Sequence, residues 1–325
     1  MTRRAEFLAN PAKQIVIAAA SDEAYALPLA VMLRSASETL GSASIIEAYV
    51  VSDGIAARTR SRVESSLSSR VSLNWVERSA SEFSDLPRWG RISLGTYHKL
   101  TLGSWLPTSV SKVLWLDCDT LLLEDIAPLW HTEFAGNTAL ACQDSLVPCL
   151  GASFGVAGWK EAGLKADAPY FNAGVMLIDV ERWRKAGVEK RSLDYLCQFG
   201  PKVWFWDQEA LNAVLAGHWK WLDPAWNFPA SMARASKEMP KIVHFSGNIK
   251  PWVVLGKGAL HDAYGRYLDR TAWSGWRPDI SWRQRLLTVY INSPLRANML
   301  PLERLHMRWT RWTTMKFQFP KNNPR

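Results

Sequence analysis

Short apolar runs alternate with helical patterns along most of the chain. The run Val113-Leu-Trp-Leu116 is a strand candidate, because a short continuous apolar run is typical of a strand that is buried on both faces. Residues 27–40 instead carry apolar side chains three and four positions apart, which indicates a helix. The repeated alternation of these two patterns predicts an α/β domain with a mostly parallel sheet.

The same patterns place the remaining elements. Predicted strands lie at 14–20, 45–52, 71–76, 112–116, 138–142, 174–178 and 241–245. Predicted helices lie at 27–40, 57–67, 95–106, 180–186, 192–199 and 208–215. Residues 143–170 contain several glycines and alanines and are predicted to form a long functional loop. The segment Trp276-Arg-Pro-Asp279 is a linker candidate, which predicts a main domain over 1–278 and an extension over 279–325.

Composition narrows the class of protein. With 48% hydrophobic and 21% charged residues, the chain is expected to form a packed core. No run approaches the roughly 18 apolar residues of a membrane span, and the first residues lack the apolar region of a secretory signal. The four cysteines show no CxxC spacing and are expected to be reduced thiols. These features predict a soluble protein in the cytoplasm.

The net charge of +9 is concentrated in the C-terminal extension. Residues 281–325 contain nine Lys and Arg and one acidic residue, whereas the rest of the chain carries 30 basic and 29 acidic side chains. A nearly neutral body is not expected to bind nucleic acid or other polyanions. Only the tail is therefore a candidate for contact with an anionic partner.

Two carboxylates follow the apolar run directly. Asp117 and Asp119 are two residues apart, and ligands of open α/β sheets bind beyond the carboxyl ends of the strands. This spacing can aim both carboxylates at one Mg²⁺ or Mn²⁺ ion that holds a diphosphate. The alternative is that the pair only caps a turn or a helix, because this motif is short and common.

Polar residues also follow the apolar pair Ile242-Val243. His244 can complete the coordination of a metal, Gly247 lets backbone approach a phosphate, and Lys250 supplies a positive charge for it. A structural histidine at a strand end is the alternative. Two further segments mix polar and apolar residues, at 170–179 and 206–212. Taken alone, Asn172 is interpreted as a turn residue and Asp207 as a helix N-cap.

These four segments, in this order, resemble the retaining glycosyltransferases of family 8, which include glycogenin and bacterial lipopolysaccharide galactosyl- and glucosyltransferases. The similarity extends from Ile15 to Trp252, nearly three quarters of the chain. It implies a single Rossmann-like nucleotide-diphospho-sugar transferase domain with helices on both faces of the sheet. It also implies a UDP-sugar donor, Mn²⁺ or Mg²⁺, and transfer of galactose or glucose to a saccharide such as lipopolysaccharide or another cell-surface glycan.

The resemblance also implies roles for individual residues. The metal ligands are expected to be Asp117, Asp119 and His244. Contacts to the nucleotide, the diphosphate and the adjoining sugar are expected from Asp22, Lys99, Asp117, Cys118, Gly247 and Lys250, with Asp22 at the uracil. The sugar pocket and the catalytic groups are expected to be Asn172, Asp207 and Gln208, with Asp144 as a weaker candidate.

The sequence departs from the family pattern at two places, and the family's retaining reaction limits the possible mechanisms. Ala24 stands where many members have Asn, so one ribose contact is expected to be missing, and residues 143–170 carry no family motif. Retention requires either a protein nucleophile or attack from the face that the leaving group vacates. Gln208 is a poor nucleophile, which favours front-face transfer, and Asp207 remains the alternative nucleophile.

Two other functions fit part of the sequence. Asp117-Cys-Asp-Thr120 also resembles the DxDxT motif of haloacid-dehalogenase-type phosphotransferases, although its threonine comes one position early and the downstream acidic motifs of that family do not occur here. A non-catalytic sugar-nucleotide or membrane binding module is the second alternative.

The tail has the pattern of an interfacial helix. At helical spacing Leu302, Leu305, Trp309 and Trp312 share one stripe, with arginines beside it. This predicts peripheral attachment to an anionic membrane, at its inner face, whereas the alternative is a helix packed on the body.

A chain ending at Trp276 is expected to keep its activity and to stop sedimenting with anionic vesicles, because each Lys or Arg near such a surface contributes about 1 kcal/mol. Co-sedimentation at low salt measures this, with neutral vesicles as the control. The prediction is wrong if the full-length protein ignores anionic vesicles or the shortened chain unfolds.

Overall fold

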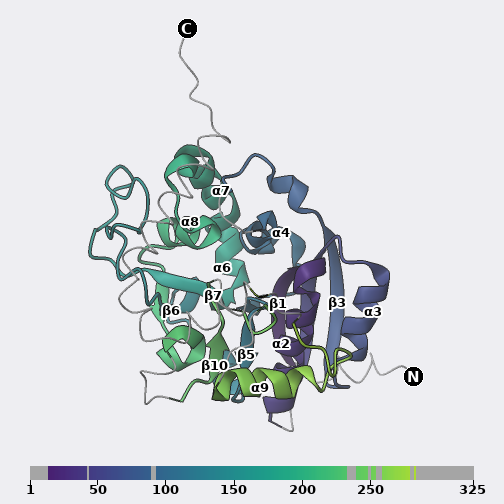
Figure 1. Ribbon diagram of the computed structural model, residues 1–325. Coiled ribbons are helices and arrows are strands. Elements are labelled where there is room, and N and C mark those ends of the chain that lie inside the picture. The colour runs from purple at the N-terminus through teal and green to yellow at the C-terminus, as the bar shows by residue number, and fades with distance from the viewer. Residues whose placement is uncertain are drawn as a thin grey trace.

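The computed structural model describes residues 14–41, 44–88, 93–232, 239–247, 250–253, 258–278 and 282. The basic segment 283–325 lies outside the described residues, so its membrane attachment stays a prediction. None of the described helices is long and apolar enough to cross a membrane. Figure 1 shows the described part as a central sheet with helices around it.

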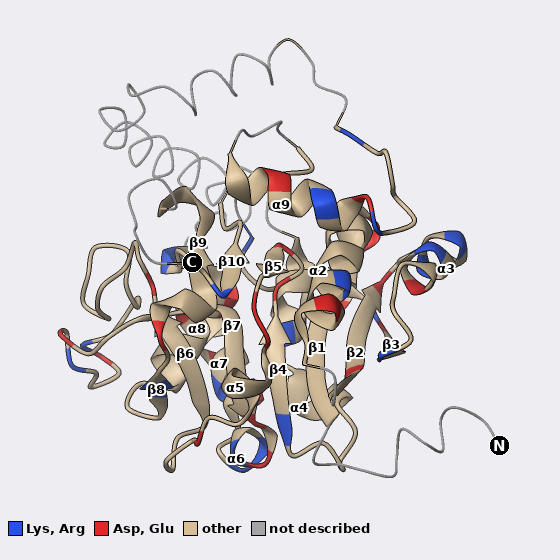
Figure 2. Cartoon of the chain, turned by 90° about the horizontal axis from the view of Figure 1, so that it is seen from below, with Lys and Arg blue, Asp and Glu red and all other residues tan. Residues whose placement is uncertain are grey.

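A seven-stranded sheet forms the centre of the molecule, and Figure 2 shows its strands side by side. In spatial order the strands are β3 (Val71–Arg78), β2 (Ile45–Asp53), β1 (Gln14–Asp22), β4 (Lys112–Leu116), β7 (Phe171–Asp179), β6 (Ala139–Gln143) and β8 (Trp219–Trp221). β7 runs antiparallel to both of its neighbours, and the other pairings are parallel. The prediction of a mostly parallel sheet is confirmed.

Each central strand contributes side chains to two separate cores. In β4, Leu114 and Leu116 belong to one core, whereas Val113 and Trp115 belong to the other, as the alternation of side chains along a strand requires. The first core is covered by α2 (Ala26–Thr39), α3 (Ala57–Ser65), α5 (Ala127–Trp130) and α9 (Ala259–Leu268). The second is covered by α4 (Leu102–Trp105), α6 (Val180–Lys185), α7 (Val188–Phe199) and α8 (Trp206–Val214). Helices on both faces confirm the predicted α/β class.

A small three-stranded sheet joins distant parts of the chain. Its strands are β5 (Thr120–Leu122), β10 (Ile242–His244) and β9 (Phe228–Pro229). β10 pairs antiparallel with β5 and parallel with β9, and only three residues separate the end of β4 from the beginning of β5. This sheet therefore brings the end of β10 to the residues that follow β4.

The predicted helix over 95–106 is wrong in one respect, because it consists of two pieces. A 3-10 helix at Leu94–Lys99 (η4) precedes α4, and its residues Tyr97, His98 and Lys99 are buried. The carbonyl of His98 accepts hydrogen bonds from Trp105 Nε1 at 2.9 Å and from Thr101 Oγ1 at 3.2 Å. In a continuous α-helix this carbonyl would accept a hydrogen bond from a backbone N–H, and here two side chains donate to it instead.

The long segment predicted over 143–170 consists of turns after the end of β6, with one isolated bridge between Cys149 and Pro169. It is anchored to α8 by Glu209, which is fully buried and accepts from the N–H of Ala157 at 2.8 Å. Glu209 also accepts from Tyr195 Oη at 2.8 Å. The buried Glu209 carboxylate, which belongs to α8, thus holds this segment in place.

Three strand ends meet at one edge of the central sheet. β1 and β4 are parallel, so Asp22, at the end of β1, and Asp117, just after β4, lie at the same edge. Because β7 is antiparallel to β4, the beginning of β7 lies there as well, and Asp117 N donates to Gly174 O at 2.8 Å. Most of the polar residues singled out from the sequence belong to this edge.

Candidate functional site

Two aspartates and one histidine cluster at this edge: Asp117, Asp119 and His244. The two aspartates belong to the turn between β4 and β5. Thr120 closes the turn, because its N–H and its Oγ1 both donate to the carbonyl of Asp117, at 3.1 and 2.8 Å. Cys118 lies between the two aspartates but packs into the first core, where its Sγ donates to Ala20 O at 3.2 Å and burial raises the pKa of the thiol. Asp117 and Asp119 therefore share the open side of the turn.

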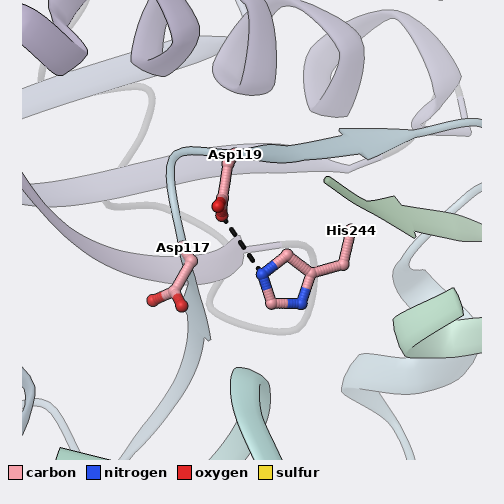
Figure 3. Close-up of side chains that lie close together, drawn as sticks. All are labelled: Asp117, Asp119 and His244. Carbon is pink, nitrogen blue, oxygen red and sulfur yellow. Dashed lines mark ion pairs between the residues drawn. The ribbon is translucent and has the colours of Figure 1, made fainter. Parts of the chain in front are cut away.

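His244 is the last residue of β10 and lies next to this turn. The pairing with β5 sets His244 opposite Thr120, and Phe245 N donates to Asp119 O at 2.9 Å. One ligand atom each of Asp117, Asp119 and His244 lies within 4.8 Å of the others (Figure 3). His244 Nε2 lies 3.2 Å from Asp119 Oδ1. The three residues expected to bind a metal are thus brought together from the β4–β5 turn and from the end of β10.

The unpaired atoms of this cluster fit a divalent cation. Asp119 Oδ1 is buried and accepts no hydrogen bond within the described structure. A buried acceptor without a partner loses about 1–3 kcal/mol, and a cation would remove that loss. Carboxylate oxygens suit Mg²⁺ and Mn²⁺, and an imidazole nitrogen adds a donor that Mn²⁺ accepts more readily than Mg²⁺. Asp117, Asp119 and His244 therefore form a group that could hold a divalent cation.

The place of the His244 ring depends on a glycine in β7. A Cβ atom added to Gly174 would lie 2.2 Å from His244 Cε1 and 2.6 Å from Nδ1, closer than any van der Waals contact. The ring therefore lies directly against the backbone of Gly174. This close approach is the physical reason for a glycine in the segment Phe171-Asn-Ala-Gly-Val175.

Lys99 connects two carboxylates in the interior. Its side chain is only 3% exposed, and Nζ lies 3.1 Å from Asp117 Oδ1 and 2.8 Å from Asp207 Oδ2. Burial alone lowers the pKa of a lysine, but Asp117 and Asp207 more than compensate and raise the pKa of Lys99 above its usual value. The ammonium group stays charged and ties η4 to the β4–β5 turn and to α8.

Charge is not balanced at the cluster. Burial raises the pKa of Asp117, and the neighbouring Asp119 and Asp207 carboxylates raise it further, against the opposing effect of Lys99. Burial also disfavours the ionised form of Asp119, but Lys250 and His244 hold the pKa of Asp119 well below its usual range. Three carboxylates thus face two ammonium groups, those of Lys99 and Lys250, which leaves one negative charge in excess. This excess favours the binding of a further positive charge.

Lys250 contacts the cluster directly. It forms an ion pair with Asp119 Oδ2 and donates to the carbonyl of Phe245 at 2.7 Å. The sequence predicts contact of Lys250 with a diphosphate, which stays a prediction, and the structure places the ammonium group on Asp119. Gly247, three residues earlier, has φ +82°, a conformation that favours glycine.

Asp144, Asn172 and Gln208 form one hydrogen-bonded group at the beginning of β7. Asp144 Oδ2 accepts from Asn172 Nδ2 at 2.9 Å and from Gln208 Nε2 at 3.1 Å. Gln208 Oε1 accepts from the N–H of Ala173 at 3.1 Å. The structure thus brings together three of the residues expected to line a sugar pocket, including the weakest candidate.

Two local alternatives from the sequence are wrong. Asn172 lies inside β7 and not in a turn. Asp207 is not an N-cap, because α8 begins at Trp206 and the Asp207 carboxylate accepts from Thr96 Oγ1 at 2.6 Å and from Lys99. Tertiary contacts therefore determine both positions.

At the end of β1, Asp22 has a local role, and its expected contact with a base stays a prediction. Its Oδ1 accepts from Tyr25 N at 3.0 Å and so caps the 3-10 helix Glu23–Tyr25 (η2). The Tyr25 ring packs edge-on against Trp252, with ring centroids 5.7 Å apart. This contact links the first loop to the segment that carries Lys250.

Sequence reasoning missed Asn227. This residue is 5% exposed and ends the 3-10 helix Pro224–Asn227 (η6) before β9. Its Oδ1 lies 2.9 Å from His244 Nδ1, and its Nδ2 donates to Asn172 Oδ1 at 2.9 Å. A single polar residue between Trp226 and Phe228 is the only local signal for it.

The chain matches a known family over most of its length. The family model described as Glycosyl transferase family 8 matches residues 16–255. General stress protein A of Bacillus subtilis is 27% identical over 281 residues, which cover 79% of this chain and 94% of that protein. The Arabidopsis thaliana protein named "Probable galacturonosyltransferase-like 8" is 29% identical over 175 residues, which cover 49% of this chain and 44% of that protein.

Crystal structures of the galactosyltransferase LgtC have the same fold. An active-site glutamine-to-glutamate mutant of LgtC superimposes with a TM-score of 0.70 at 25% identity, and the match covers 83% of this chain and all of LgtC. LgtC in complex with donor and acceptor sugar analogs superimposes with a TM-score of 0.68, also at 25% identity, over 83% of this chain and 99% of LgtC.

Gly174→Ala is expected to weaken binding of Mn²⁺ by at least about tenfold, because the added methyl group displaces the His244 ring from its place beside Asp119. Isothermal titration with Mn²⁺ in the presence of UDP measures the affinity. Gly265→Ala in α9 is the matched control, because a Cβ there meets no atom within 4 Å. Binding of Mn²⁺ by Gly174→Ala with the affinity of the unmodified protein would contradict the prediction.

Proposed function

The chain belongs to glycosyl transferase family 8 and is a glycosyltransferase, and we propose that it transfers galactose or glucose from a UDP-sugar to a saccharide with the help of a divalent cation. The observation that carries this proposal is the cluster of Asp117, Asp119 and His244, whose Asp119 Oδ1 is buried and without a hydrogen bond. Such a cluster suits a cation that binds a diphosphate.

The relatives support the kinds of ligand proposed. LgtC is a galactosyltransferase and was crystallised with donor and acceptor sugar analogs. We propose a saccharide acceptor of the same kind here, such as lipopolysaccharide or another cell-surface glycan. A peripheral position at the inner face of the membrane, through residues 279–325, would bring the enzyme close to such an acceptor.

Transfer breaks the bond between the anomeric carbon and a diphosphate oxygen, so negative charge develops on the departing group. When bound, the cation supplies Lewis-acid stabilisation of that charge. Lys250 lies beside Asp119 and can add its own positive charge to the diphosphate. Lys99 does not need to contact the diphosphate to contribute, because its ion pair with Asp117 holds that carboxylate in place. No general acid is required from the protein.

The acceptor oxygen forms the new bond on the face that the diphosphate leaves, and its proton passes to the departing diphosphate. We propose that Gln208 stabilises the positive sugar in this step, and the hydrogen bonds with Ala173 N–H and Asp144, which hold its amide in one orientation, support this. Asp207 is 5% exposed and already bonded to Lys99 and Thr96. Both of its carboxylate oxygens thus accept hydrogen bonds and are less available to attack the sugar. This supports front-face transfer over a mechanism with a protein nucleophile.

The family match also decides between the alternative functions. It covers the DxDxT-like segment and all three other motifs, whereas a phosphotransferase interpretation uses only one of them. In addition, Asp117 is bonded to Trp115 Nε1 at 2.8 Å and paired with Lys99, so it is not a free nucleophile. Galactosyltransferase relatives favour an enzyme over a non-catalytic binding module.

Turnover is expected to require a divalent cation and Asp119. Asp119→Asn keeps the shape of the side chain and removes its charge, and loss of several kcal/mol of charge stabilisation corresponds to about a thousandfold or more in kcat/KM. Release of UDP from UDP-galactose and UDP-glucose measures this, with Asp194→Asn, an exposed residue of α7, as the control. Turnover that persists in excess chelator would show that the proposal is wrong.

Gln208→Ala is expected to lower kcat more than the affinity for the donor, because its amide acts on the developing positive charge. Lys250→Ala is expected to weaken both, because its charge acts on the diphosphate before and during the reaction. Steady-state kinetics and titration with UDP separate the two effects. An unchanged kcat in Gln208→Ala would remove this residue from the catalytic group.

A further inference from the structure

The orientation of each amide near the cluster is fixed by backbone donors. Asn172 Oδ1 accepts from the N–H of Gly174 at 3.0 Å, so this atom is the oxygen and the other is the NH₂ group. The NH₂ group then donates to Asp144 Oδ2 at 2.9 Å. A backbone N–H can only donate and an ionised carboxylate can only accept, so the Asn172 amide has one consistent orientation.

This orientation determines that of Asn227. Because Asn172 Oδ1 is an acceptor, the atom of Asn227 that contacts it at 2.9 Å is the NH₂ group. The remaining atom, Asn227 Oδ1, is an acceptor and lies 2.9 Å from His244 Nδ1. The ring must therefore carry a proton on Nδ1 to make this hydrogen bond.

The other ring nitrogen is then an acceptor as well. In a neutral imidazole with its proton on Nδ1, Nε2 presents a lone pair. This lone pair faces Asp119 Oδ1 at 3.2 Å, which has no hydrogen-bond donor within the described structure. Two lone pairs opposite each other at that distance are repulsive unless a proton or a metal cation lies between them, and in the neutral ring with its proton on Nδ1 only a metal cation can fill this place.

We propose that Asn227 is a positioning residue that holds the proton of His244 on Nδ1 and so directs the Nε2 lone pair to the cation. The inference rests on the proposed function, because it takes the cluster to be a metal site. Asn227 reaches His244 because β9 follows it directly and pairs with β10, and Gly174 leaves room for the ring. The partner of the second nitrogen fixes the tautomer of a ligating histidine in metal sites generally.

The hydrogen bonds extend further than the metal site. They run from Asp144 through Asn172 and Asn227 to His244, so the group that faces the expected sugar pocket also determines the state of the metal ligand. Gln208 shares Asp144 with Asn172. Asn227 is thus the link between the two halves of the site.

The tautomer is measured without metal, in the full-length protein that contains ring-labelled ¹⁵N histidine, at a pH where the ring is neutral. His244→Gln assigns the signal. We expect the ¹⁵N shift of His244 to show a protonated Nδ1 and an unprotonated Nε2. A proton on Nε2 in the unmodified protein would overturn the inference, whatever the metal affinity.

Variants of Asn227 test the cause. Asn227→Leu removes the acceptor and is expected to shift the proton toward Nε2 and to weaken Mn²⁺ binding in the presence of UDP by about 10- to 100-fold. Asn227→Asp retains an acceptor and is expected to keep the proton on Nδ1. Asn137→Leu is the control, because the amide of Asn137 bonds only to carbonyls of its own turn.

Each outcome decides one question. An unchanged tautomer or an unchanged Mn²⁺ affinity in Asn227→Leu contradicts the inference, since a purely structural residue would change stability alone. Should Asn227→Leu fail to fold, the unmodified protein and Asn227→Asp still decide it through the tautomer. If the unmodified protein bound no Mn²⁺ with UDP present, the proposed function would fail, while the ¹⁵N shifts would still test the role of Asn227.

Discussion

The rest of the site depends on keeping buried carboxylates paired with positive charge. A carboxylate removed from water loses several kcal/mol unless a partner compensates. Lys99, with its side chain 3% exposed, lies between Asp117 and Asp207 and is close to both. The 3-10 helix that carries Lys99, the turn after β4 and the first turn of α8 come from distant parts of the chain. One ammonium group therefore holds together three of the elements from which the site is built.

The reversed direction of β7 supplies what a fully parallel sheet would lack. Pairing between β4 and β7 ends at Leu116 and Val175, so the beginning of β7 extends beyond its neighbour. The N–H groups of Ala173 and Gly174 then donate to the amides of Gln208 and Asn172 instead of to β4. Backbone groups that the sheet does not use thus fix the orientation of polar side chains, at the edge where the carboxylates lie.

The sequence predicts the parts of this structure that depend on local pattern. The strand 112–116 and the carboxylates after it are apparent, because a buried strand leaves a continuous apolar run, and the alternation of strands and helices suffices for the fold class. β5 and β8 have three residues each, too few to show any period. The partner of Asp207 was not predictable, because Lys99 is 108 positions away and reaches it only through the folded second core. Asn227 shows the same limit, since its contact with His244 depends on the pairing of β9 with β10.

Lys250 sets a condition on how a cation can enter. Its ammonium group lies on Asp119 and also donates to the carbonyl of Phe245. A cation at Asp119 Oδ1 would share this carboxylate with the ammonium group on Oδ2, so the two positive charges would repel one another. A diphosphate that contacts both would compensate this repulsion, so by thermodynamic linkage the cation and the diphosphate would favour one another's binding.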